Sequence, residues 1–320
     1  IKLDDFELTY AALNGASALA AGWLQEHGVG PGDRVGIMLP NIPQFPILYF
    51  GALRLGAVVV PMNPLFKERE VEYYLSDSGA KVLFAWDGVA DQAQPGAVAA
   101  GAAFEIVDAG FAAKLGTYSP APAVVDRAAD DTAVILYTSG TTGKPKGAEL
   151  THSNLLSNVE VCVNLFNGGS EDVIFGGLPL FHSFGQMCGL NAAVKIGAML
   201  TLIPRFDPTK ALEVLQRDKA TVMQGVPTMY VALLQHPEHG NYDVAQLRLA
   251  VSGGASLPVE VLRGFEREFG VILLEGYGLS ETSPVASFNH ADRERKAGSI
   301  GTSIAGVEMR LIDTDWNDVP

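Results

Sequence analysis

Short apolar segments alternate with helical patterns along most of this chain of 320 residues. Residues 8–28 carry apolar side chains at helical spacing, between Thr9 as a predicted N-cap and Gly28 as a predicted stop. Helices are also predicted over residues 43–56 and 67–79. Strands are predicted over residues 34–39, 57–60, 80–86, 132–138, 173–179, 199–204, 221–227, 247–253 and 271–278. Because strand, helix and strand in this order require crossover connections, the predicted fold class is α/β with a mostly parallel sheet.

The composition predicts a globular protein without nucleic-acid or membrane partners. Hydrophobic residues make up 48% of the chain and charged residues 18%, which suits a large buried core. The net charge of −14 argues against nucleic acid and anionic membranes as primary partners, because both bind clustered Lys and Arg. Prolines interrupt the most apolar stretch, residues 35–60, so no transmembrane segment is predicted. The only two cysteines, Cys162 and Cys188, suit a reducing cytoplasm better than a disulfide framework.

The segment YTSGTTGKPKG at residues 137–147 directly follows a predicted strand. Its glycines let the backbone turn sharply, and backbone N–H groups in such a turn can surround an anion. Lys144 and Lys146 add positive charge in an acidic chain, which suits a triphosphate. The segment is not a Walker A loop, because the GxxxxGK[ST] spacing is absent and Pro145 follows the first lysine. The alternative is a polar turn between two strands.

This segment resembles the phosphate loop of the adenylate-forming superfamily, which includes acyl- and aryl-CoA synthetases, luciferases and peptide-synthetase adenylation domains. Three further segments resemble that superfamily in the same order: LPLFHSFG at 178–185, VSGGASLP at 251–258 and EGYGLSETS at 275–283. Together they identify residues 1–320 as similar to a large N-terminal AMP-binding domain. The resemblance is strongest to medium- and long-chain fatty acid–CoA ligases.

The resemblance implies a layered α/β body in which two sheets pack with helices. We expect approximate subdomains over residues 1–130 and 131–290, and the start of a small β-rich subdomain over 291–320. Residues 87–131 are expected to form a connection with weak helices. Relatives continue past the equivalent of residues 317–320 into a C-terminal domain that carries the adenylation lysine. We expect this chain to lack that domain, to bind nucleotide, and to catalyse poorly or not at all.

The resemblance also implies which residues contact ATP or AMP. They are Thr138, Ser139, Gly140, Thr141, Thr142, Gly143, Gly253, Gly254, Ala255, Gly276, Tyr277, Gly278 and Ser280. Tyr277 is expected to pack on adenine and Ser280 to contact the α-phosphate. Glu281, with Thr138, is expected to hold Mg²⁺, which prefers oxygen ligands shared with phosphates. Without the motif, Tyr277 would be interpreted as a core aromatic residue and Glu281 as a solvated surface charge.

Three residues are implied in catalysis and five in binding the acid. Lys144 and Lys146 would offset phosphate charge, and His182 would lie beside the reacting carboxylate; a structural histidine is the alternative. The residues expected to bind the acid are His182, Phe184, Met187, Val226 and Gly278, with Leu190 and Met229 as further apolar candidates. Relatives that activate amino acids carry an aspartate where this chain has His182, so an amino acid is not expected.

The size of the acid is predicted from one glycine. Acetate-specific relatives carry a tryptophan where this chain has Gly278, so a deeper slot is expected, and Gly278→Trp should favour short acids. A medium- or long-chain fatty acid is the first choice and an aryl acid the second. ATP, Mg²⁺ and coenzyme A complete the expected reaction, in the cytoplasm, with a homodimer as one expected assembly. Two other functions stay open: a nucleotide-binding module without catalysis, and an acyl-AMP ligase that loads a carrier protein.

Overall fold

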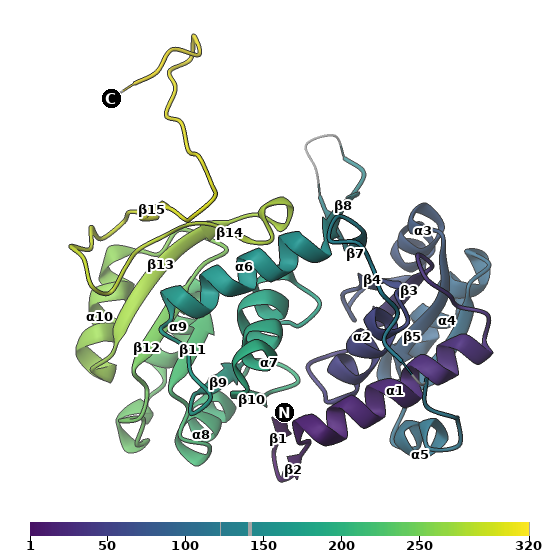
Figure 1. Cartoon of the computed structure of the whole chain (residues 1–320). Coiled ribbons are helices and arrows are strands. Elements are labelled where there is room, and N and C mark those ends of the chain that lie inside the picture. Colours follow the sequence, from purple (N-terminus) through teal and green to yellow (C-terminus); the bar gives the residue numbers. More distant parts are fainter. Residues whose placement is uncertain (122, 140–142, 320) are drawn as a thin grey trace.

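The computed structural model describes residues 1–121, 123–139 and 143–319, which form two α/β bodies side by side (Figure 1). One contains a six-stranded sheet in the order β6-β5-β3-β4-β7-β8, and the other a nine-stranded sheet in the order β15-β14-β13-β12-β11-β9-β10-β1-β2. The strands from β3 to β7 and from β9 to β13 pair in parallel. Two helix-packed, mainly parallel sheets confirm the predicted fold class.

The six-stranded sheet and its helices come from the first half of the chain. Its strands are β3 (Arg34–Met38), β4 (Val58–Pro61), β5 (Ala80–Trp86), β6 (Ala103–Val107), β7 (Thr132–Thr138) and β8 (Lys146–Thr151). The helices are α1 (Tyr10–Glu26), α2 (Gln44–Arg54), α3 (Glu68–Ser78), η1 (Asp87–Val89), α4 (Ala90–Ala99) and α5 (Phe111–Leu115). The Thr9 side chain accepts a hydrogen bond from the Ala12 N–H, and Gly28 follows the helix with a φ of 77°, as the sequence predicts for both ends of α1.

The nine-stranded sheet combines the N-terminal hairpin with the second half of the chain. Its strands are β1 (Lys2–Leu3), β2 (Phe6–Glu7), β9 (Val173–Gly176), β10 (Met199–Leu202), β11 (Val222–Gly225), β12 (Leu249–Ser252), β13 (Ile272–Gly278), β14 (Val285–Phe288) and β15 (Thr302–Ser303). The helices are α6 (His152–Leu165), η2 (Gly185–Asn191), α7 (Ala192–Ile196), α8 (Pro208–Arg217), α9 (Pro227–Gln235), η3 (His239–Asn241), α10 (Val259–Phe269) and η4 (Ser280–Thr282).

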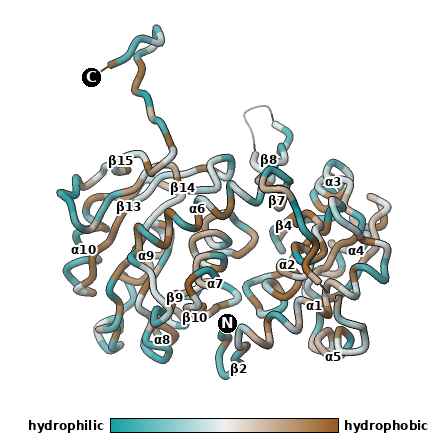
Figure 2. The backbone as a smooth tube through the Cα atoms, in the orientation of Figure 1, coloured by the Kyte–Doolittle hydropathy of each residue, from teal (hydrophilic) through white to brown (hydrophobic). Residues whose placement is uncertain are grey.

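The largest hydrophobic core lies between the two sheets. It joins residues of α1 and α2, such as Trp23 and Tyr49, to residues of α6, β9 and β10, such as Val159, Ile174 and Leu200. Hydrophilic residues gather instead at outer turns, for example around α8 and α10 (Figure 2). This single core contains side chains from both sheets. It therefore holds the strand ends of one sheet at fixed positions relative to those of the other.

The structure corrects the prediction for residues 87–131. This stretch contains strand β6 between helices α4 and α5, so a connection of weak helices is wrong. β6 is the edge of its sheet, and within it Glu105 and Val107 are buried whereas Ile106 is exposed. A buried Glu beside an exposed Ile hides the hydrophobic alternation by which a strand is recognised.

Two further features of the chain complete the fold. Residues 308–319 extend away from the body, after Ile304 and Val307 have packed against the core, with one bridge between Ile312 and Asp318 (Figure 1). In the part of the chain that the structure describes, helices are too short or too polar to cross a bilayer.

Candidate nucleotide-binding site

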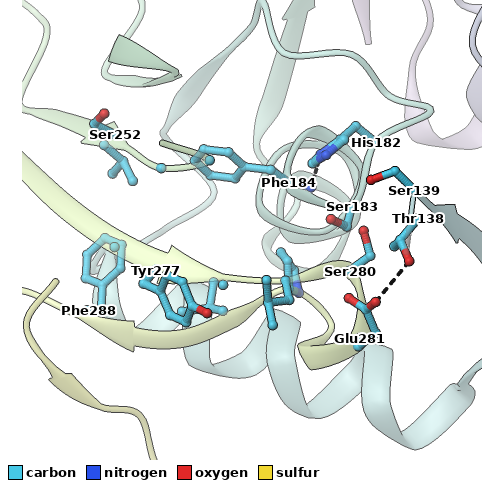
Figure 3. A pocket seen from close by; sticks show the side chains of 18 residues that line it. Thr138, Ser139, His182, Ser183, Phe184, Ser252, Tyr277, Ser280, Glu281 and Phe288 are labelled. Carbon is cyan, nitrogen blue, oxygen red and sulfur yellow. Dashed lines mark hydrogen bonds between the residues drawn. The ribbon is translucent and has the colours of Figure 1, made fainter. Parts of the chain in front are cut away.

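A cavity of about 380 Å³ lies where the loops after β7, β9, β12 and β13 meet (Figure 3). The carboxyl ends of parallel strands are the usual position of ligand sites in α/β folds. The residues that line the cavity are Thr138, Ser139, His182, Ser183, Phe184, Val251, Ser252, Gly253, Gly254, Gly276, Tyr277, Gly278, Leu279, Ser280, Glu281, Pro284, Val285 and Phe288. Parts of all four sequence motifs therefore meet in one place.

The phosphate-loop segment reaches the cavity through its first residues. Thr138 ends β7, and it lines the cavity together with Ser139. The predicted contacts Gly140, Thr141 and Thr142 lie outside the described residues. On the other side of the loop, Gly143, Lys144 and Lys146 are exposed to solvent and do not line the cavity. The two lysines are therefore exposed and are not part of the cavity lining.

The two residues predicted to hold a metal ion are in contact. The Thr138 hydroxyl donates a hydrogen bond of 3.0 Å to Oε1 of Glu281 (Figure 3). Glu281 lies on η4, and the buried side chain of Asn158 on α6 holds this segment. Its Nδ2 donates to the carbonyl oxygens of Thr282 (3.2 Å) and Val285 (2.9 Å). α6 therefore fixes the position from which Glu281 reaches the end of β7.

Close packing against β14 explains the glycines on either side of Tyr277. A Cβ on Gly276 would lie 2.3 Å from the Phe288 ring, and one on Gly278 would lie 1.9 Å from the Pro284 carbonyl oxygen. Between them, the Tyr277 side chain is 40% exposed at the cavity. A planar base could stack on this ring without exact hydrogen bonding.

The contact between Gly278 and Pro284 changes how the substitution Gly278→Trp must be interpreted. Gly278 lines the cavity, but a side chain there would meet the backbone of Pro284 before it filled any slot. A tryptophan at this position would therefore move β14 as well as change the cavity volume. Gly278→Trp is therefore not a simple test of acid length.

The segment after β12 approaches the cavity from the other side. Gly253 and Gly254 line the cavity, and Gly254 has a φ of 80°, a conformation that favours glycine. A Cβ on Gly253 would lie 3.1 Å from the Phe184 ring, so the glycine leaves room for that ring. Ala255, the third small residue predicted for this wall, does not line the cavity.

Asn41, which follows β3, holds the segment that carries His182. Its buried side chain donates to the carbonyl oxygens of Gly176 (3.1 Å) and Leu178 (2.8 Å) and accepts from the Leu180 N–H (2.9 Å). His182 Nδ1 accepts a hydrogen bond of 3.3 Å from the backbone N–H of Phe184. The imidazole lines the cavity and is exposed there, but the protein atoms around it partly desolvate the ring, and this desolvation lowers the pKa of His182. The side chain is therefore neutral at pH 7.

The other predicted acid-binding residues divide into two groups. Phe184 lines the cavity beside His182, as the sequence predicts. Met187 is fully buried in the core between the sheets, and Val226 packs against the core beneath α8, α9 and α10; neither lines the cavity. The further candidates Leu190 and Met229 are likewise core residues. Cavity residues that sequence analysis did not identify are Ser183, Val251, Ser252, Leu279, Pro284, Val285 and Phe288.

We expect the His182 imidazole to titrate below its ordinary pKa of 6.5. The unfolded chain then binds a proton at His182 more readily than the folded chain does, so protonation destabilises the fold. Above pH 6.5 the ring is neutral in both states, and its contribution to the free energy of unfolding is complete. It is lost as the pH falls from 6.5 through the lowered pKa. An NMR titration measures the midpoint, with the ring signal assigned by its absence in His182→Gln. A midpoint at or above 6.5 would contradict the desolvated position of the ring.

The structure has two sheets packed with helices, and a cavity at the ends of their strands. This is the fold of the N-terminal domain of adenylate-forming enzymes. The chain belongs to the AMP-binding enzyme family, whose match covers residues 1–320. It is 36% identical to the long-chain-fatty-acid–CoA ligase of Bacillus subtilis (strain 168), over 96% of this chain and 61% of that ligase.

Two solved structures have the same fold. ATP-bound MatB from Rhodopseudomonas palustris is 32% identical with a TM-score of 0.90, and the match covers 99% of this chain and 64% of that one. The anthranilate CoA ligase AuaEII in complex with anthranoyl-AMP is 26% identical with a TM-score of 0.94, over 100% and 64% of the two chains. The chain thus spans less than two thirds of the length of these relatives.

Proposed function

We propose that this chain is the nucleotide- and acid-binding part of an AMP-forming acid–CoA ligase. The proposal rests on one observation, that three kinds of chemical group line the same cavity. Thr138, Ser139 and Glu281 supply oxygen atoms for phosphates and a cation, Tyr277 offers an aromatic face, and Phe184 stands at an apolar wall. Both ATP-bound MatB and AuaEII in complex with anthranoyl-AMP have the same fold, which supports nucleotide binding by this chain.

The residues present fit a magnesium ion. Mg²⁺ is usually held by one or two carboxylates together with substrate phosphates and waters. Glu281 and the Thr138 hydroxyl, 3.0 Å apart at the cavity, would be its protein ligands. The ion would supply positive charge that offsets the phosphates. A cluster of three or more His, Cys, Asp or Glu side chains that could hold a metal by itself is absent from the described residues.

In the proposed reaction, a carboxylate oxygen attacks the α-phosphorus of ATP. An O–P bond forms, the bond to pyrophosphate breaks, and the product is an acyl-adenylate. The coenzyme A thiolate then attacks the acyl carbon, a C–S bond forms, and AMP leaves. This chain would hold the adenosine on Tyr277 and place the carboxylate beside the neutral His182, so that the two anions meet in a fixed orientation.

The character of the cavity favours an uncharged acyl group. Its apolar wall is made by Phe184, Val251, Val285 and Phe288. Among the described residues that line it, Glu281 is the only one whose side chain is charged at neutral pH. A dicarboxylate would therefore find no positive side chain among these residues for its second carboxylate. An amino acid's ammonium group would find only Glu281, which is the proposed ligand of the metal ion. We propose a medium- or long-chain fatty acid.

An aryl acid is the second candidate. The cavity of about 380 Å³ lies at the small end of the range of about 300–1,000 Å³ for ligand sites, and the nucleotide would fill part of it, so a single ring needs less additional space than an alkyl tail. The anthranilate ligase with the same fold gives this alternative a specific basis. A carrier protein in place of coenzyme A, a homodimer, the proposed subdomain limits and a cytoplasmic location stay predictions.

Stable adenylate analogues with different acyl groups test both the site and the acid. We expect a decanoyl-sulfamoyl-adenosine to bind the chain at least about 30-fold more tightly than the acetyl analogue. Each buried methylene contributes about 0.8 kcal/mol, so three of them already exceed that ratio. Titration calorimetry gives the affinities. Equal affinity for the two analogues would overturn the fatty-acid proposal, and tighter binding of a benzoyl analogue would establish the aryl alternative.

A further inference from the structure

Helix α3 contacts the arm of the phosphate-loop segment that leads into β8. The Tyr73 hydroxyl on α3 donates a hydrogen bond of 2.7 Å to the carbonyl oxygen of Pro145. Pro145 stands between Lys144 and Lys146, the two cations proposed to act on phosphate. Both partners are half-buried, so water competes for this bond less than at an open surface. The bond fixes the backbone from which both lysine side chains extend.

The same helix also holds the arm of the loop that comes from β7. The Tyr137 hydroxyl, one residue before Thr138, donates a hydrogen bond of 2.7 Å to Oδ2 of Asp77. Burial, and next the bond to Asp77, raise the pKa of Tyr137, so its hydroxyl stays protonated and able to donate. Tyr73 and Asp77 are four residues apart and share one face of α3. One helix face therefore holds both arms of the loop.

Aromatic packing makes these contacts rigid. The Tyr74 ring lies 4.2 Å from the Tyr137 ring between centroids, and the Tyr73 ring meets Tyr137 edge-on at 6.3 Å. Packed aromatic pairs of this kind add stability beyond the area that they bury. The Tyr73 hydroxyl is thus presented to Pro145 by a ring that is already ordered before any ligand binds.

We propose that Tyr73 is a positioning residue for the phosphate loop, which acts through Pro145 to hold Lys144 and Lys146 where the phosphates of ATP bind. Tyr73 does not line the cavity, so it touches neither the nucleotide nor the acid. Its effect is to order the backbone in advance, which lowers the entropy cost of binding the phosphates. The inference rests on the proposed function, because it needs a nucleotide in the cavity.

Tyr73→Phe removes the hydroxyl and keeps the ring. We expect it to weaken binding of Mg²⁺-ATP by roughly 3- to 10-fold, the usual effect of one hydrogen bond, and to leave adenosine binding unchanged. Tyr74→Phe is the matched control, because it deletes the hydroxyl of the neighbouring tyrosine, which has no hydrogen bond to the described residues. Titration calorimetry with ATP and with adenosine measures both affinities for the wild type and each variant.

The pattern across ligands separates positioning from a general structural role. Asp77→Ala, which releases the other arm of the loop, should give the same selective loss for ATP. Loss of adenosine and ATP affinity in equal measure, or unchanged ATP affinity in Tyr73→Phe while Lys144→Ala weakens ATP, would overturn the inference and leave the proposed function standing. Absence of any ATP binding by the wild-type chain would overturn both.

Discussion

Replacing Lys144 and Lys146 together by alanine is expected to weaken ATP binding by roughly 100-fold and to leave adenosine binding within about twofold. Hydrogen bonds to charged groups contribute about 1.5–3 kcal/mol each, and the lower value applies because both lysines are exposed. Two contributions of about 1.5 kcal/mol amount to a factor of about 100. Titration calorimetry with the two ligands measures the difference.

The control for this experiment removes the same charge elsewhere. Lys195 lies on α7, where it pairs with Glu160, and Lys219 follows α8; neither lines the cavity. The double alanine variant at these two positions should bind ATP and adenosine like the wild type. If the Lys144 and Lys146 variant lost ATP and adenosine affinity equally, the loop would be a structural turn rather than a phosphate site.

Glu281→Gln is expected to abolish the dependence of ATP binding on Mg²⁺. In the wild type, we expect Mg²⁺ to increase ATP affinity about 10-fold or more, because the carboxylate and the phosphates share the ion. The glutamine can still accept the hydrogen bond from Thr138, so the fold should be unchanged. ATP affinity measured with Mg²⁺ and with EDTA gives the result for each protein.

Glu149 provides a matched control for this change. It also accepts a hydrogen bond from a threonine hydroxyl, that of Thr132 at 2.8 Å, but it lies on β8 outside the cavity. Glu149→Gln should keep the full response to Mg²⁺. If the Glu281→Gln variant responded to Mg²⁺ like the wild type, Glu281 would not be a ligand of the metal ion.

Much of the fold could be predicted where local pattern and packing agree. β5 and β7 have the bounds that their apolar runs predict, and α1 begins after Thr9 because its side chain caps the first turn. β8 and β14 were not predicted, although both position the site. β8 is polar and mostly exposed, and β14 is a strand of only four residues that follows the motif at residues 275–283. Neither carries a local signal of a strand.

The candidate site could be predicted only as far as its motifs extend. Asn41 and Asn158 hold the His182 and Glu281 segments through bonds to residues more than 100 positions away in the chain. A lone asparagine in the sequence gives no sign of such contacts. Met187 is predicted in the acid pocket because it is apolar, as an alkyl tail requires. On η2, however, it points into the core between the sheets, a direction that only the packing of η2 decides.

We propose that one cavity binds the nucleotide, with adenine at Tyr277 and the phosphates at the end of β7. A crystal structure of this chain with Mg²⁺-ATP would locate the ligand. We expect adenine to be stacked on Tyr277 and beside Gly253, with the metal ion between the phosphates, Thr138 and Glu281. ATP bound away from this cavity, for example in the polar groove lined by Arg34 and Glu149, or a cavity left empty at saturating ATP, would contradict it.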